Sequence, residues 1–165
     1  MKIQILFTLL LLQFTSCYTF RGISIPPAAN SFYVEQFIAF APEAPPFLGQ
    51  NLTEAIKDKF RSESRLVYSE VDPDLEFSGE ITEFIISAEA PQAGQTTSFN
   101  RLTISVQIEY TNNLDETGGW EGSRRFSQFI DYPSDQNFIQ VQDELINQIN
   151  VLLLEKIFNA AFTSW

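Results

Sequence analysis

A run of alternating residues, 101–111, constrains the fold of this chain more than any other feature of the sequence. Five large side chains in it alternate without a break with polar ones: Leu102, Ile104, Val106, Ile108 and Tyr110. Because successive side chains of a strand point to opposite faces, this alternation predicts a β-strand with one buried face and one polar face. The fold must therefore contain a sheet that is covered on one side.

The residues after this strand predict a hairpin. Residues 112–119 contain the turn-forming residues Asn, Asp and Gly, and residues 120–132 have the composition of the returning antiparallel strand. Two cross-strand ion pairs are expected in this hairpin, each worth less than about 1 kcal/mol: Arg101 with Asp131, and Glu109 with Arg125.

Two amphipathic helices are predicted. Residues 48–62 form one, with an apolar stripe at four-residue steps: Leu48, Leu52, Ile56 and Phe60. After Pro133, both Ser134 and Asp135 are candidate N-caps of a second, longer helix. Its broad apolar face comprises Phe138, Val141, Leu145, Ile149, Leu152 and Ile157, widened by Ile146, Leu153 and Phe158. Aromatic residues at its end are expected to pack in the core: Phe158, Phe162 and Trp165.

The remaining segments predict further strands. Residues 31–40 have the composition of a strand, with apolar side chains on both faces. A short strand is expected at 66–69 and a long one at 75–88, whose apolar residues change face near Gly79 and so indicate a bulge or twist there. Residues 89–100 have no periodicity and predict a loop. This order of elements predicts a two-layer α+β sandwich.

The N-terminal residues have the layout of a secretory signal that ends at the only cysteine. Lys2 precedes an almost purely apolar run, 3–12, which is too short to span a bilayer. The segment Phe14-Thr-Ser-Cys17 resembles a bacterial lipobox, in which the thiol receives a diacylglyceryl group, the chain is cut before the cysteine and the new amine is acylated. An ordinary signal peptide with a free cysteine near its cleavage site is the alternative. The predicted parts are a lipoprotein signal peptide (1–16), an extended tether (17–30) and an α+β domain (31–165).

Lipidation would decide where the domain works. Three acyl chains on Cys17 would hold it stably on a membrane surface, since two or more chains are needed for lasting attachment. Tyr18, rather than an aspartate, follows the cysteine. By resemblance to the sorting rule of Gram-negative envelopes, this implies transfer to the outer membrane, on its periplasmic side.

Composition argues against several classes of function. The chain has no histidine, which removes an imidazole base, a Ser-His-Asp triad and His-ligated metal sites. Lipid would consume the single cysteine, which removes disulfides and thiolate chemistry. A net charge of −11 disfavours nucleic acid and anionic lipid surfaces. We therefore expect no catalytic residue, no cofactor, no metal site and no nucleic-acid partner.

Several segments, in their order along the chain, are similar to those of the LPS-assembly lipoproteins, the LptE family. The similar segments are Phe20-Arg-Gly-Ile-Ser-Ile-Pro26, Leu52-Thr-Glu-Ala-Ile-Lys-Asp-Lys-Phe60, Asn100-Arg-Leu-Thr-Ile104, Phe126-Ser-Gln-Phe-Ile-Asp-Tyr132 and Ile157-Phe-Asn-Ala-Ala-Phe-Thr-Ser-Trp165. The resemblance implies two helices packed on a mixed, mostly antiparallel sheet of about four strands. It also implies a plug inside the outer-membrane β-barrel LptD, which assists barrel assembly and takes part in lipopolysaccharide transport without catalysis.

Basic residues of some family members are thought to contact lipopolysaccharide phosphates. No motif carries those positions over to this chain, so Arg101, Arg124 and Arg125 are candidates from charge alone. The competing interpretation makes them surface or ion-paired arginines on strands.

Two other functions stay open on the sequence. One is a stand-alone lipid- or glycan-binding envelope lipoprotein with its own apolar cavity. The other is a carboxylate-dependent hydrolase that uses Glu76 with Glu80, or Asp131 with Asp135. Apolar side chains on the second face of the predicted strands favour the plug, because they suit a surface that a partner covers: Tyr33, Phe37 and Phe84. Helices on both faces of the sheet would explain the same residues.

Overall fold

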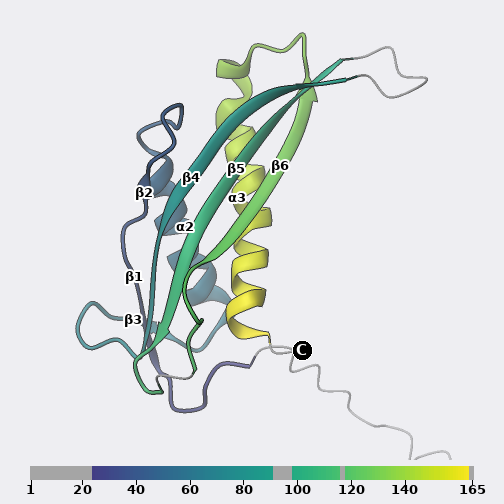
Figure 1. Cartoon of the computed structure of the whole chain (residues 1–165). Helices are drawn as coiled ribbons and strands as arrows, with labels where there is room; N and C mark the ends of the chain where they lie inside the picture. Colours follow the sequence, from purple (N-terminus) through teal and green to yellow (C-terminus); the bar gives the residue numbers. More distant parts are fainter. Residues whose placement is uncertain (1–23, 91–97, 116–117, 164–165) are drawn as a thin grey trace, which may run out of the picture.

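A computed structural model describes residues 24–90, 98–115 and 118–163 (Figure 1). The predicted signal peptide, Cys17, the first part of the tether, Trp165 and most of the predicted loop 89–100 lie outside the described residues. The elements in chain order are β1 (Ser31–Val34), β2 (Ile38–Ala39), α2 (Leu48–Glu63), β3 (Val67–Tyr68), β4 (Leu75–Glu89), β5 (Phe99–Asn112), β6 (Arg124–Pro133) and α3 (Phe138–Phe162).

One mixed sheet forms the first layer of the fold. Its strand order is β3-β1-β4-β5-β6, and β2 pairs with β4 beyond the end of β1. The long strands β4, β5 and β6 are antiparallel, whereas β1 and β2 run parallel to β4, and β3 runs parallel to β1. Helices α2 and α3 lie side by side behind the sheet (Figure 1). The predicted α+β sandwich is confirmed, with six strands rather than about four.

The predicted strand 31–40 is broken in the middle, which accounts for one of the additional strands. The backbone N–H of Phe37 donates to Oγ1 of Thr53 on α2 at 2.9 Å, and that hydroxyl donates to the carbonyl of Gly49 at 2.8 Å. Phe37 is therefore drawn into the core, and the alternation shifts by one residue after it. As a result Ile38 and Phe40 face outward, with 59% and 64% of their surface exposed.

The irregularity of β4 lies three residues further along the strand than predicted. The pairing register of β4 with β5 shifts between Ile81 and Glu83, so Thr82 is the extra residue of a bulge. Gly79 has another role: a Cβ there would lie 2.7 Å from the Phe37 ring and 2.4 Å from the carbonyl oxygen of Gln107. The glycine lets the buried Phe37 ring pack directly on the strand, and the bulge changes which residues face the helices.

Both predicted helices are present. The four stripe residues of α2 are all buried, as their spacing predicted. Asn137, rather than Ser134 or Asp135, caps α3: its side chain accepts from the N–H of Ile139 at 3.0 Å. The cap lies later because residues 133–136 form a turn first, with the N–H of Gln136 donating to Pro133. Of the predicted apolar face, Leu152 is 40% exposed, while Leu154 is buried in its place.

Phe60 of α2 joins the two layers at the centre of an aromatic cluster. Its ring centroid lies 4.8 Å from Phe77 of β4 and 5.2 Å from Phe162 of α3. Phe32 and Phe158 lie at 5.5 and 5.8 Å. The prediction that Phe158 and Phe162 pack in the core is confirmed, since they are 3% and 0% exposed.

Residues 24–30, the last part of the predicted tether, lie against the domain. The N–H of Ser24 donates to the carbonyl of Phe162 at 2.5 Å, and Ala29 is completely buried. One oxygen of Asp74 accepts from the N–H groups of Asn30 and Ser31 and from the Ser31 hydroxyl, at 2.8 to 3.0 Å. These bonds hold the segment at the end of the sheet where β1 and β4 begin.

The aromatic cluster predicts how stability responds to two phenylalanine substitutions. Phe60→Ala is expected to lower the free energy of unfolding by about 3–5 kcal/mol, because it opens a cavity among four packed rings. Phe40→Ala, the matched control at a largely exposed site, should change it by less than about 1 kcal/mol. Urea denaturation of the domain would measure both, and equal losses would contradict a core centred on Phe60.

Candidate functional site

The face of the sheet that points away from the helices is the main candidate site, and we call it the open face. Its residues follow from the register of the three long strands: Glu76, Ser78, Glu80, Glu83, Ile85 and Ser87 of β4; Arg101, Thr103, Ser105, Gln107, Glu109 and Thr111 of β5; Arg125, Ser127, Phe129 and Asp131 of β6. Within the described part of the chain, no helix packs over this face (Figure 1). The polar half of the alternation in 101–111 therefore forms a surface.

At one end of the open face, Arg101 binds Asp131 as predicted. Its Nε and Nη2 atoms donate to the two carboxylate oxygens at 2.6 and 2.9 Å, a bidentate pair. Glu89 lies 3.6 Å from the same guanidinium, which is also 3.9 Å from the ring centroid of Phe129. The hydrogen bonds from Arg101 lower the pKa of the Asp131 carboxyl. Ile85 and Phe129 face outward beside this pair, each 48% exposed.

In the middle of the open face, Arg125 pairs with Glu83 rather than with the predicted Glu109. The distance from Nη2 to the Glu83 carboxylate is 2.5 Å. Arg125 can reach β4 because the residue between them is the small Ser105, whose hydroxyl lies 2.8 Å from Glu83 and 2.9 Å from the hydroxyl of Ser127. The hydrogen bonds from Arg125 and then from Ser105 lower the pKa of Glu83.

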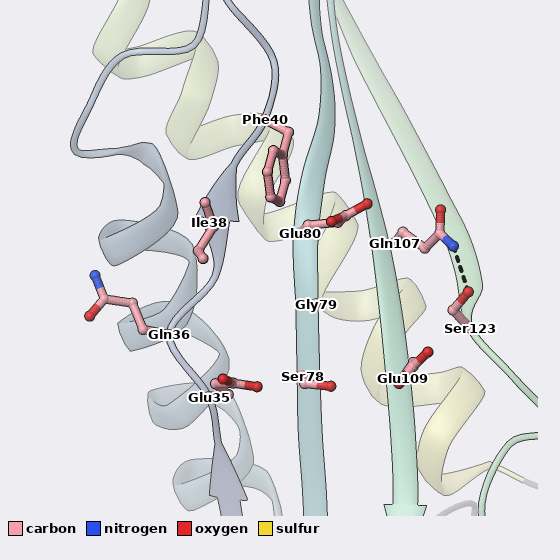
Figure 2. Close-up of a pocket in the computed structure, with 10 residues that line it drawn as sticks. All are labelled: Glu35, Gln36, Ile38, Phe40, Ser78, Gly79, Glu80, Gln107, Glu109 and Ser123. Atoms are coloured by element: carbon pink, nitrogen blue, oxygen red, sulfur yellow. Dashed lines mark hydrogen bonds between the residues drawn. The ribbon is translucent and has the colours of Figure 1, made fainter.

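At the other end, the open face is hollowed beside β2 (Figure 2). The hollow has a volume of about 320 Å³. Three carboxylates, Glu35, Glu80 and Glu109, line it together with the exposed side chains of Ile38 and Phe40. This end of the face thus combines negative charge with an apolar edge.

The three candidate arginines are not brought together. Arg101 lies opposite Asp131, whereas Arg125 lies opposite Gln107, six residues away along β5 or about 20 Å. Arg124 precedes Arg125 in β6 and therefore points to the opposite side of the strand. Its guanidinium lies 4.7 Å from the ring centroid of Trp120. A contact with lipopolysaccharide phosphates stays a prediction for these residues, two of which are already ion-paired within the domain.

The two carboxylate pairs do not form a catalytic arrangement. Glu76 and Glu80 lie on the same face but four residues apart along one strand, which is about 13 Å. Asp131 is bound by Arg101, and Asp135 is exposed in the turn that follows β6. Among the described residues, no group of acidic or cysteine side chains could hold a metal ion. Over the same residues, neither helix is both long and apolar enough to cross a membrane.

Sequence patterns identified the wrong residues as the exposed apolar ones. Phe37 and Phe84 are core residues, with 2% and 3% of their surface exposed, and Tyr33 is half-buried. Phe40 and Ile38 face outward instead, because of the break before them. A second feature escaped the sequence analysis although a signal was present: Asn150 interrupts the apolar stripe of α3 between Ile146 and Leu154, and it is buried.

Comparison with known proteins gives a family match and several structural likenesses. The family model for lipopolysaccharide assembly, LptE, matches residues 23–161. The fold is similar to protein XCC0632 from Xanthomonas campestris, with a TM-score of 0.51 and 12% identity over 82% of this chain and 87% of that one. It is also similar to PelC from Paraburkholderia phytofirmans, crystallised as a dodecamer, with a TM-score of 0.50 and 11% identity over 87% and 95%. At these identities the likeness concerns the fold alone. A comparison with curated proteins gave no match.

The Arg101–Asp131 pair predicts part of the pH dependence of stability. Because the folded-state pKa of Asp131 is lowered, its contribution is present above the unfolded pKa near about 4 and is lost as pH falls through the folded value. Asp131→Asn should cost at most about 1 kcal/mol at neutral pH, since the side chain is 39% exposed.

Denaturation at neutral and acidic pH would test this expectation. The variant should lose less stability than the unsubstituted protein between pH 7 and pH 3, and Asp135→Asn is the control. Identical pH profiles for the unsubstituted protein and Asp131→Asn would contradict a stabilising pair.

Proposed function

The chain belongs to the LptE family of lipopolysaccharide-assembly proteins, and on this premise we propose that it plugs an outer-membrane β-barrel of the LptD kind. In this role it assists the assembly of the barrel and takes part in moving lipopolysaccharide to the cell surface. The observation that carries the proposal is the family match over residues 23–161, which spans nearly the whole domain.

The open face supports a role as a plug. It is a broad sheet surface on which apolar side chains stand exposed among polar ones, at Ile85 and Phe129 at one end and at Ile38 and Phe40 at the other. Exposed apolar groups of this kind, rimmed by polar residues, are typical of surfaces that contact a partner. The wall of a surrounding barrel would cover such a surface without any change in the fold.

We propose that the protein acts through contacts and not through catalysis. The candidate carboxylates support this, since Glu76 and Glu80 stand apart and Asp131 is held by Arg101. Arg101 and Arg125 form ion pairs within the domain, with Asp131 and Glu83. Where charges are paired in this way, the face can lie against a protein wall at a lower desolvation cost than unpaired charges would have.

A stand-alone lipid-binding function has less support. It requires an apolar cavity of several hundred Å³ inside the domain. The space between sheet and helices is filled instead by the rings around Phe60, and Phe77 stacks on Tyr110 at 4.7 Å. The hollow beside β2 is open to the surface and lined by carboxylates, which does not suit acyl chains.

The proposal includes a lipid anchor on Cys17 in the outer membrane. Cys17→Ser is expected to remove the protein from the outer-membrane fraction, because the acyl chains provide the lasting attachment there. Fractionation and mass spectrometry of the N-terminal peptide would measure this. An N-terminal peptide without acyl chains in the unsubstituted protein would overturn the anchor but leave the plug untouched.

Recovery of the barrel with the protein tests the plug itself. The full chain with a C-terminal affinity tag, purified in mild detergent, is expected to bring down an LptD-like barrel in defined proportion. Phe129→Glu combined with Ile85→Glu should reduce this recovery at least about tenfold, because charges would be buried against the partner.

Ile139→Glu is the control, since Ile139 is 79% exposed on α3, away from the open face. Thermal melts would show that each variant is folded. Purification of the unsubstituted protein as a monomer without a barrel would overturn the proposed function, and full recovery with the double variant would reject the open face as its contact surface.

A further inference from the structure

The outer side of β6 is a second surface of the sheet, and we call it the β6 edge. β6 is the last strand in the sheet order, and no described segment pairs with its outer side (Figure 1). On the opposite side of the three long strands, β4 is covered by β1 and β2. Every second residue of β6 therefore directs its backbone N–H and C=O groups away from β5, where no described strand receives them.

The β6 edge is regular enough to accept another strand. Natural proteins usually protect an edge with a bulge, a proline, a central charge or a covering segment. The register of β6 with β5 runs from Arg124 to Pro133 without a shift, so this stretch contains no bulge. Its one proline is its last residue, and residues 126–130 in its middle are uncharged.

Apolar side chains flank the β6 edge on both faces of the sheet. Phe129 is 48% exposed on the open face. Phe126 and Ile130 point to the helix side and are only partly buried there. A strand added at this edge would place its own side chains beside these three, and such cross-strand apolar pairs stabilise a sheet.

The sequence of β6 is complementary to itself in one antiparallel register. When Gln128 lies opposite Gln128 of a second copy, Arg125 lies opposite Asp131 of that copy, and Phe126 lies opposite its Ile130. A two-fold axis repeats each of these pairs, so opposite charges meet twice and apolar groups meet twice. The β6 edge therefore matches a second β6 edge in both charge and hydrophobicity.

Neighbouring registers lack this match. Directly opposite residues of an antiparallel pair point to the same face, so the axis has to pass through a residue of β6. With the axis at Ser127, Arg125 would lie opposite Phe129, and with the axis at Phe129 it would lie opposite Pro133. Charge complementarity thus selects the register centred on Gln128.

The two charged groups remain available for a second partner. All described contacts of Arg125 use its Nη2 atom, which leaves Nε and Nη1 as further donors, and the side chain is 55% exposed. Asp131 is 39% exposed, and a carboxylate can accept more bonds than the two from Arg101. Directly opposite Cβ atoms are about 5 Å apart, which an arginine side chain spans easily.

We propose that two copies of this chain pair through their β6 edges, antiparallel and centred on Gln128. The two sheets then form one continuous sheet, with the helices of both copies on one side and both open faces on the other. The pairing covers the β6 edge of copies that have no barrel. This role rests on the proposed function, because a barrel that encloses one copy would separate the pair.

Disulfide formation at the axis tests the pairing. The full chain is purified in detergent from cells that make it in excess over any barrel, and is treated with a mild oxidant. Gln128→Cys is expected to give a covalent dimer on non-reducing gels, because directly opposite Cα atoms are about 4.5–5.5 Å apart, within disulfide range. The unsubstituted protein reports any disulfide from Cys17, the only cysteine of the sequence.

Arg124→Cys is the matched control on the same face of β6. In the proposed register Arg124 lies opposite Tyr132, eight residues and about 26 Å from Arg124 of the second copy. It should therefore give no covalent dimer. Equal yields from Gln128→Cys and Arg124→Cys, or no dimer from either, would overturn the proposal.

A charge exchange between copies tests the register. In the Gln128→Cys background, Arg125→Glu places two acidic groups opposite each other, and Asp131→Arg places two basic groups opposite each other. Each variant alone should give at least about fivefold less covalent dimer, because the like-charge pair occurs twice. A mixture of the two variants should restore the yield, because both pairs across the mixed edge have opposite charges again.

Thermal melts would show that both charge variants are folded, and the same two proteins are compared alone and mixed. A mixture that gives no more dimer than either variant alone would overturn the proposed register. Recovery of the barrel is measured on the tagged chain in a separate experiment. Loss of the barrel without loss of the dimer would therefore contradict the plug alone, and the reverse result would contradict the pairing alone.

Discussion

The packing of two helices on one side of a single sheet is the constraint on which the rest of the structure depends. Phe60 is its centre, because four rings from both layers meet around it. Both helices of the described residues pack on the same face of the sheet, so they leave its other face uncovered. The open face follows from that arrangement, because it is the side of the sheet that the helices leave uncovered.

The two basic residues of the open face form ion pairs with acidic residues of the same domain. Arg101 is shared between Asp131 and Glu89, and Arg125 binds Glu83 beside Ser105. The charged residues that line the hollow beside β2 are all acidic: Glu35, Glu80 and Glu109. A protein of net charge −11 would be repelled by the phosphates of lipopolysaccharide over any broad contact surface. Its part in lipopolysaccharide assembly is therefore easier to understand as shaping and holding a protein partner than as carrying the lipid.

The last part of the predicted tether bears on how such a protein would be held. Residues 24–30 are fastened to the domain by Asp74 and by the end of α3, so the chain leaves the domain at one defined end of the sheet. An anchor at Cys17 would therefore connect to the domain at that end of the sheet.

Local periodicity was enough to determine the main elements. Alternation in 101–111 and four-residue steps in 48–62 each reflect one element that buries one side, so β5, α2, the sandwich and the Arg101–Asp131 pair could be predicted from the sequence. Only the tertiary structure decided where β1 ends, which way Phe37 and Phe40 point, and that the side-chain oxygen of Asn150 is buried with no hydrogen-bond partner among the described residues. These depend on contacts between distant segments, above all the hydrogen bond from Phe37 to Thr53, which shifts the alternation by one residue. Periodicity records which side of an element is buried, but not where a distant hydroxyl interrupts the strand.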